Sequence, residues 1–355
     1  MIMNGQTLKG KIYRAPTPLE CYNMLEQLAQ KERLTMSNAG SAEKPFKVAA
    51  VQAAPVFLDR EATVEKACEL IAEAARNGAR LVAFPESFIP AYPDWVWAVP
   101  AGEGGLLSGL YAEFLANAVE VPSRATEMLC RAAKKAKAYV VLGISERNSE
   151  ASGGSMYNTL IYIGSDGVIM GKHRKLVPTG GERLVWAQGD GSTLNAYDTE
   201  LGKLGGLICW ENYMPLARYA MYAWGTQIYI AATWDRGEPW LSTLRHIAKE
   251  GRVFVVSAGM SLRKDQIPDR YEFKQKYYGG VGEWVNVGDS AIVNPEGEII
   301  AGPLHEQEGI LYAEIDPAEM RGPRWMLDVA GHYGRSDVFE LTVHTDGRPM
   351  LRTDK

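Results

Sequence analysis

The stretch Gly205-Gly206-Leu207-Ile208-Cys209-Trp210-Glu211-Asn212 contains a short apolar run that ends at a cysteine. This run predicts a buried strand over 204–208, and the pattern from Pro215 to Trp224 predicts a helix shortly after it. In α/β proteins, strand ends are rigid and open onto loops, so they carry reactive side chains. Free N–H groups and the helix dipole would favour a thiolate here and bind an oxyanion. From position alone, a structural thiol is an equally good interpretation of Cys209.

Strands and helices alternate on both sides of this stretch. The segments before it predict strands at 47–52, 80–85 and 139–144, helices at 59–75 and 122–138, and a hairpin at 159–170. The segments after it predict strands at 227–232 and 253–257, a helix at 240–250 and a hairpin at 291–301. This order, given twice, indicates two mostly buried sheets with helices outside them. No flexible linker separates the two halves, so we expect one domain.

The ends of the chain differ from this regular pattern. Leu19–Leu34 predicts one short amphipathic helix, and a linker of small residues follows at 37–42. Translation could start at Met36, which would make residues 1–35 an optional extension, or these residues could form an arm packed on the body. We therefore expect an extension and linker over 1–45, the domain over 46–340 and a tail over 341–355.

The composition excludes several classes of protein. Of the 355 residues, 46% are hydrophobic and 23% charged, and the net charge is −5, as in ordinary globular proteins. This charge balance gives no electrostatic footprint for nucleic acid or an acidic membrane, and no run of about 18 apolar residues predicts a membrane span. No apolar block follows the basic residues of the first 20, so a secretory signal is not expected. We expect a cytoplasmic protein with neither a nucleic acid nor a membrane as partner.

The cysteines give no sign of a disulfide scaffold or a metal site. Four cysteines in the whole chain are too few for a scaffold, and zinc-ligand spacing is absent. Cys68 and Cys130 fall on the apolar faces of predicted helices, where a buried, inert thiol is the usual outcome. The context of Cys209 differs from both.

Two further strand ends carry ionisable side chains. Glu86 follows an apolar strand and precedes an aromatic run, so we expect the raised pKa that a general base requires. A solvated loop carboxylate is the commoner alternative. Lys175 ends a basic run that lacks the spacing of a phosphate-binding loop and could be a solvated hairpin end. Because Lys175 adjoins the apolar step Leu176-Val177-Pro178, we expect it to point inward.

Together the three segments resemble the nitrilase superfamily of carbon–nitrogen hydrolases. The mark of that family is Glu, Lys and Cys in this order, each at the end of a strand in repeated αββα halves. The nitrilase branch in particular is matched by residues 173–179, 182–186, 188–192, 209–215, 245–248 and 331–333. The resemblance covers about residues 46–340 and implies an α/β fold, a four-layer αββα sandwich.

The resemblance implies that an organic nitrile is hydrolysed to the carboxylic acid and ammonia. Cys209 would form a thioimidate and then a thioester, Glu86 would act as base, and Lys175 would stabilise the tetrahedral intermediates. Glu182 matches the family's second glutamate, which orients the lysine. No metal or organic cofactor is implied. Tyr92 and Trp210 are the predicted substrate contacts, although aromatic residues more often belong to the core.

Other readings share these motifs. An amidase or carbamoylase would use the same three residues, and a cyanide-degrading enzyme is a further alternative. A non-catalytic binding protein on this fold would have no need to keep them together. The motifs do not name the nitrile.

The resemblance also carries expectations about assembly and about one departure. Nitrilases associate through the helices that cover their sheets and often build spirals. The stripe Tyr219–Trp224 predicts an exposed apolar interface, so we expect a homo-dimer or larger assembly. Gly180-Gly181 stands where many nitrilases carry a bulky residue, which predicts a looser or wider rim, and Ala91 replaces a glycine common in the family.

Overall fold

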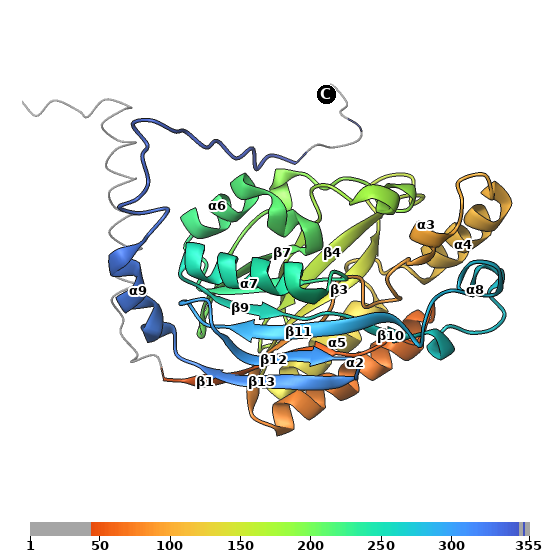
Figure 1. Cartoon of the computed structure of the whole chain (residues 1–355), viewed down its shortest axis with the longest axis horizontal. Helices are drawn as coiled ribbons and strands as arrows, with labels where there is room; N and C mark the ends of the chain where they lie inside the picture. The colour runs from red at the N-terminus through yellow and green to blue at the C-terminus, as the bar shows by residue number, and fades with distance from the viewer. Residues whose placement is uncertain (1–43, 348–350, 352–355) are drawn as a thin grey trace, which may run out of the picture. The chain divides into compact units, whose positions relative to one another are not determined.

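Two sheets with helices on their outer sides form the body of the protein (Figure 1). The computed structural model describes residues 44–347 and residue 351. The first sheet has the order β13 (Gly309–Ile315), β1 (Phe46–Gln52), β2 (Ala79–Ala83), β3 (Tyr139–Arg147), β4 (Met156–Ile163) and β5 (Ile169–Arg174). The second has the order β10 (Ser261–Arg263), β11 (Trp284–Val293), β9 (Phe254–Ser257), β8 (Ile228–Ala232), β7 (Gly202–Ile208) and β6 (Tyr197–Thr199), and β12 (Ile299–His305) also pairs with β11.

The buried side chains divide into three apolar layers, which confirms the αββα sandwich. Val48 and Ala50 of β1 lie in the layer between the sheets, whereas Ala49 and Val51 lie in the layer that also holds the helices of the first sheet. Those helices are α2 (Arg60–Arg76) and α5 (Arg124–Ala136), and α6 (Pro215–Ala223) and α7 (Gly237–Gly251) cover the second sheet. Because both faces of the strands are covered, their sequences are continuous apolar runs.

The predicted helices begin where side chains cap them. Asp59 accepts a hydrogen bond from the Ala62 N–H at 2.9 Å and starts α2. Ser123 precedes α5, and its own N–H donates to Thr126 Oγ1 at 2.8 Å, so the helix begins at Arg124 and not at Pro122. Element bounds otherwise follow the predicted segments to within a few residues.

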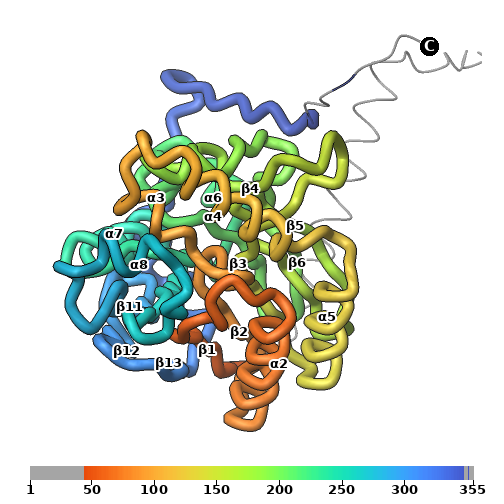
Figure 2. The backbone as a smooth tube through the Cα atoms, turned by 90° about the vertical axis from the view of Figure 1, so that its right-hand side faces the viewer, coloured from red at the N-terminus to blue at the C-terminus, as the bar shows by residue number. Residues whose placement is uncertain are grey.

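Several elements are additional to the predicted ones. Strand β13 pairs antiparallel with β1 from Phe46↔Ile315 to Gln52↔Gly309, so distant parts of the sequence lie side by side (Figure 2). The further helices are α3 (Trp95–Ala98), α4 (Gly104–Asn117), α8 (Glu272–Tyr277) and α9 (Arg321–Met326). The predicted helix at Leu19–Leu34 lies outside the described residues.

Two expectations about burial are wrong. The stripe Tyr219–Trp224 is not an exposed apolar surface, because Ala220, Met221 and Tyr222 are buried in the layer beneath α6. Cys68 and Cys130 are only partly buried, because each lies at the margin of its helix's apolar face. No helix among residues 44–347 is long and apolar enough to cross a membrane.

Candidate active site

The two sheets bring Glu86, Lys175 and Cys209 together at their strand ends. Glu86 follows β2 and Lys175 follows β5 in the first sheet, and Cys209 follows β7 in the second. All three side chains are buried. Lys175 Nζ lies 3.6 Å from Glu86 Oε2, and the Cys209 thiol lies beside the Glu86 carboxylate. The predicted inward orientation of Lys175 is confirmed.

Cys209 stands at a sharp turn from β7 into a 3₁₀ helix, η3 (Cys209–Tyr213). Its φ of 52° lies in the left-handed region, where a residue with a Cβ is strained by about 1–3 kcal/mol. Hydrogen bonds hold the turn: Asn212 Nδ2 donates to the Cys209 carbonyl at 2.8 Å, and Tyr229 donates to Asn212 Oδ1 at 2.8 Å. The strained turn ends the strand and keeps the thiol beside Glu86.

The Glu86 carboxylate is oriented from both sheets. Asn158 of β4 donates from Nδ2 to Oε2 at 2.8 Å, and the Trp234 N–H, which follows β8, donates to Oε1 at 2.6 Å. Gly143 of β3 lies under the Glu86 backbone, and a Cβ there would be 2.2 Å from the Pro85 oxygen. Only glycine allows this close approach, so Gly143 lets β3 pack directly against the backbone that carries Glu86.

Burial sets the protonation of the two reacting groups. It raises the pKa of Glu86, which the positive charge of Lys175 partly offsets, so the predicted raised pKa is confirmed in direction. Burial and the negative charge of Glu86 raise the pKa of the Cys209 thiol well above its usual value. The expected thiolate is therefore wrong, because burial and the charge of Glu86 outweigh the dipole of α6, which begins only at Pro215. A neutral thiol beside a carboxylate needs that carboxylate as its base.

Lys175 is held as an ammonium by its carboxylate neighbours. Burial lowers the pKa of Lys175, but the negative charges of Glu86 and Glu182 outweigh this and raise it. Lys175 Nζ donates to Glu182 Oε2 at 2.7 Å. Glu182 lies in the 3₁₀ helix η1 (Gly180–Leu184) and also accepts from the Thr179 N–H at 2.7 Å. The fourth predicted residue thus lies directly against the lysine.

The two predicted substrate contacts have different environments. Tyr92 is buried, donates to Glu182 Oε1 at 2.8 Å and stacks on Trp234 with ring centroids 4.4 Å apart. Burial and the charge of Glu182 raise the pKa of Tyr92 well above its usual value, so it remains a neutral phenol. Trp210 is 52% exposed, and its Nε1–H donates to Asp235 Oδ2 at 2.9 Å. Tyr92 joins the buried group, whereas Trp210 lies at the surface.

Glu211 links the two sheets behind the site, a role that sequence reasoning missed. Its Oε1 accepts the Leu176 N–H at 2.6 Å, and its Oε2 accepts the Ile208 N–H at 2.9 Å. His173 Nε2 lies 3.0 Å from Oε2. Burial alone would raise the pKa of Glu211, but His173 and the N–H donors hold it below its usual value. One carboxylate therefore joins the residue after Lys175 to the residue before Cys209.

The wider rim expected at Gly180-Gly181 is wrong, because a side chain from α3 fills the space. A Cβ at Gly180, where φ is 50°, would be 2.8 Å from Cη2 of Trp97. A Cβ at Gly181 would be 2.8 Å from the Val96 carbonyl oxygen. Among the described residues, no group of three or more His, Cys, Asp or Glu side chains is placed to hold a metal ion.

Comparisons with known proteins agree with this fold. The carbon–nitrogen hydrolase family model matches residues 47–324. An aliphatic nitrilase from Sinorhizobium fredii (strain HH103) is 42% identical over 315 residues, 87% of this chain and 98% of its own. A bifunctional nitrilase/nitrile hydratase from Nicotiana tabacum is 40% identical, over 85% of this chain and 87% of its own.

Solved structures show the same architecture. Saccharomyces cerevisiae Nit3, a member of branch 10 of the nitrilase superfamily, superposes with a TM-score of 0.64 at 24% identity, over 82% of this chain and 97% of its own. An amidase from Nesterenkonia sp. gives a TM-score of 0.58 at 18% identity, over 82% of this chain and 97% of its own. At these sequence identities, the two structures show a shared fold and nothing more. On the family match and the close relatives, the chain belongs to the nitrilase branch of the carbon–nitrogen hydrolase family.

Proposed function

We propose that this protein hydrolyses an organic nitrile to the carboxylic acid and ammonia, with Cys209 as the nucleophile. The observation that carries the proposal is the buried contact of Glu86, Lys175 and Cys209, which come from both sheets. The named nitrilases at about 40% identity support the substrate class.

In the first half of the reaction, Glu86 takes the Cys209 proton and the sulfur attacks the nitrile carbon. Glu86 passes this proton to the nitrile nitrogen, so a thioimidate forms and Glu86 is ionised again. Water that Glu86 deprotonates then adds to the thioimidate carbon and gives a tetrahedral intermediate. Lys175 donates hydrogen bonds to the developing negative charge, and its raised pKa keeps it charged in this buried place.

In the second half, protonated nitrogen leaves as ammonia and a thioester remains on Cys209. A second water, again deprotonated by Glu86, attacks the thioester and releases the carboxylic acid. Glu182 orients Lys175 through the 2.7 Å hydrogen bond during both steps. We propose that Tyr92 contacts the bound substrate beside the lysine and that exposed Trp210 forms part of its entrance.

Release of the amide is the second candidate outcome, because a relative is named as both a nitrilase and a nitrile hydratase. The deciding experiment assays a nitrile and its matching amide side by side, with free cyanide as a third substrate. Turnover of the nitrile alone supports the proposal. Turnover of the amide alone favours an amidase or carbamoylase, and preference for cyanide favours a cyanide-degrading enzyme. A panel of aliphatic, arylaceto- and aromatic nitriles then identifies the preferred substrate.

A labelling experiment tests whether the activity depends on Cys209. Iodoacetamide should modify one thiol in step with the loss of activity, and mass spectrometry should place that modification on Cys209. Cys68 and Cys130 are free and partly exposed, so their modification without loss of turnover provides the internal control. An activity that no thiol reagent affects would contradict the cysteine mechanism.

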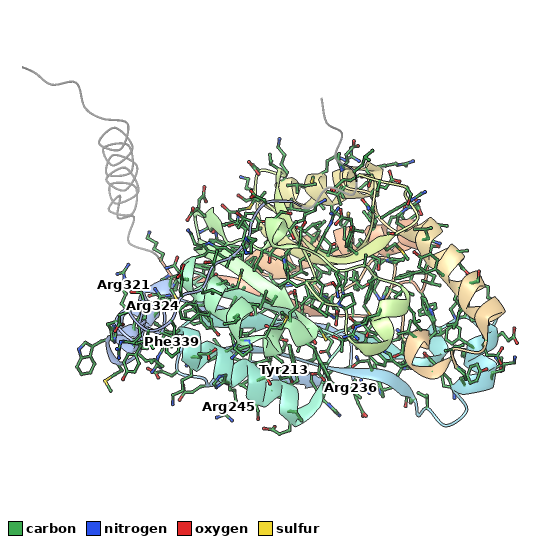
Figure 3. All side chains as sticks on the ribbon, turned by 90° about the horizontal axis from the view of Figure 1, so that it is seen from above. Tyr213, Arg236, Arg245, Arg321, Arg324 and Phe339 are labelled. Carbon is green, nitrogen blue, oxygen red and sulfur yellow. The ribbon has the colours of Figure 1, made fainter. Side chains whose placement is uncertain are left out.

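We also propose a homo-oligomer, a dimer or a spiral, that acts in the cytoplasm. Apolar side chains are exposed on α9 and the segment after it, including Trp325 at 79% and Phe339 at 77% exposure. Phe339 lies at the same end of the molecule as Arg321 and Arg324 of α9 (Figure 3). The three described cysteines are free thiols, which a reducing compartment preserves.

We propose residues 46–340 as the catalytic domain, which the family match over 47–324 supports.

Light scattering at micromolar concentration measures the mass of the proposed homo-oligomer, and a monomer mass would contradict it.

A further inference from the structure

A chain of hydrogen bonds runs from the molecular surface to Lys175. The indole N–H of Trp97 donates to the Tyr92 oxygen at 3.0 Å, and the Tyr92 hydroxyl donates to Glu182 Oε1 at 2.8 Å. The other oxygen of Glu182 accepts from Lys175 Nζ at 2.7 Å. Trp97 is 51% exposed, whereas the other three side chains are buried. The outermost member of the chain is therefore accessible, and the innermost is the proposed catalytic amine.

Trp97 fixes the direction of the Tyr92 proton. An indole nitrogen can only donate, so the Tyr92 oxygen must accept from Trp97. Its single proton is then free to point to Glu182 Oε1, which leaves Oε2 for Lys175. The Tyr92 ring itself cannot turn, because it is stacked on Trp234 with an interplanar angle of 7° and lies edge-on to Trp186 at 5.7 Å. The N–H of Trp97 is thus the contact that orients the Tyr92 hydroxyl toward Glu182.

The position of the Trp97 ring depends on the absence of a side chain at residue 180. A Cβ at Gly180 would be 2.8 Å from Cη2 and 2.9 Å from Cζ3 of Trp97, closer than real Cβ contacts. Gly180 opens η1, the short helix that carries Glu182. The same glycine therefore allows the indole to pack and allows the turn that places Glu182.

We propose that Trp97, packed on Gly180, is a positioning residue of this site. It positions Lys175 through Tyr92 and Glu182. The inference rests on the proposed nitrile hydrolysis and adds to it a residue that sets the ratio of acid to amide.

The experiment compares four variants of the full-length protein on one nitrile. Trp97→Phe keeps a ring but removes the N–H, and we expect a two- to tenfold lower kcat, an unchanged KM and a larger amide fraction, as for the loss of one hydrogen bond. Trp97→Ala also removes the ring, and we expect an amide fraction at least as large as that of Trp97→Phe. Gly180→Ala displaces the ring and should raise the amide fraction as Trp97→Phe does.

The matched control is Trp224→Phe, which changes a partly buried tryptophan at the carboxyl end of α6 and should leave the amide fraction unchanged. Thermal melting identifies a Gly180→Ala protein that fails to fold, and Trp97→Phe and Trp97→Ala then decide the question. A wild-type amide fraction in both Trp97→Phe and Trp97→Ala overturns the inference. Failure of the wild-type protein to convert any nitrile instead overturns the proposed function, so the two failures are distinguishable.

Discussion

Replacing Glu182 with glutamine should redirect the reaction from acid to amide. After water adds to the thioimidate, the tetrahedral intermediate can expel ammonia, which gives the acid, or the thiol, which gives the amide. Ammonia leaves well only when its nitrogen is protonated. Lys175 is the positively charged donor that lies against Glu86 and Glu182. The choice between the two exits therefore depends on how firmly Lys175 is held.

The hydrogen bonds of Glu182 give the magnitude. Its two oxygens accept three donors, from Lys175 and Thr179 on Oε2 and from Tyr92 on Oε1. A glutamine has one acceptor oxygen, and its NH₂ group would face a donor on the other side. A hydrogen bond between charged groups contributes about 1.5–3 kcal/mol, and about 1.4 kcal/mol is a tenfold change in a ratio of rates. We expect the amide-to-acid ratio of Glu182→Gln to rise about 10- to 100-fold, with a lower total rate.

Chromatographic separation of amide and acid from one nitrile measures the ratio. Glu200→Gln is the control, because Glu200 is an exposed residue that pairs with Arg80 at 3.1 Å and makes none of the contacts described for the site. A normal rate with an unchanged ratio in Glu182→Gln would refute the reasoning and make Glu182 a structural residue of η1.

Cys209→Ala should abolish nitrile turnover, whereas Cys68→Ala should retain it and alter at most the melting temperature; more than trace turnover by the first variant would exclude Cys209 as the nucleophile. The kcat/KM of the wild type should increase with pH through an ionisation above 4.5, because burial raises the pKa of Glu86 and the reaction needs its ionised form. Asn158→Ala removes a donor to that ionised form and should move this limb to higher pH, and a limb that stays in place contradicts the role of Asn158. Burial raises the pKa of Asp94 to about 6 from 3.8, so the folded protein binds that proton more tightly than the unfolded chain and loses stability as the pH rises through this window, by up to about 3 kcal/mol. Asp94→Asn should remove that loss in melts recorded from pH 4 to 8, and parallel pH profiles for the two proteins would disprove it.

The sandwich could be predicted from sequence because its strands are buried on both faces. Strands such as β8 consist of buried apolar residues, and Asp59 marks where α2 begins. Strand β13 was not predicted, because only Ile315 in it is buried and its sequence therefore carries little periodic signal. Its partner β1 also lies at the other end of the domain's sequence. Helix α4 begins with two glycines and is largely exposed, which removes both the propensity and the amphipathic signal of a helix.

Glu86 and Cys209 could be predicted because each ends an apolar run, and Lys175 because an apolar step follows it at the end of a basic run. Asn158 and Glu211 could not, because what identifies them is a contact across the fold. Asn158 reaches Glu86, 72 residues away, and Glu211 reaches Leu176, 35 residues away. The expected thiolate failed for a different reason: burial beside a carboxylate outweighs any dipole, and burial is a property of the tertiary structure.

The Glu211 carboxylate has a consequence for how the protein loses activity. Its two oxygens hold N–H donors at 2.6 Å and 2.9 Å, one from each sheet. A slide of about 1 Å between the sheets would break at least one of these bonds, since hydrogen bonds weaken steeply beyond about 3.2 Å. Helices and strands would survive such a slide intact. Under gentle denaturation, activity should therefore disappear while the far-ultraviolet circular dichroism is still native, which makes turnover a sensitive gauge of whether the two halves remain in register.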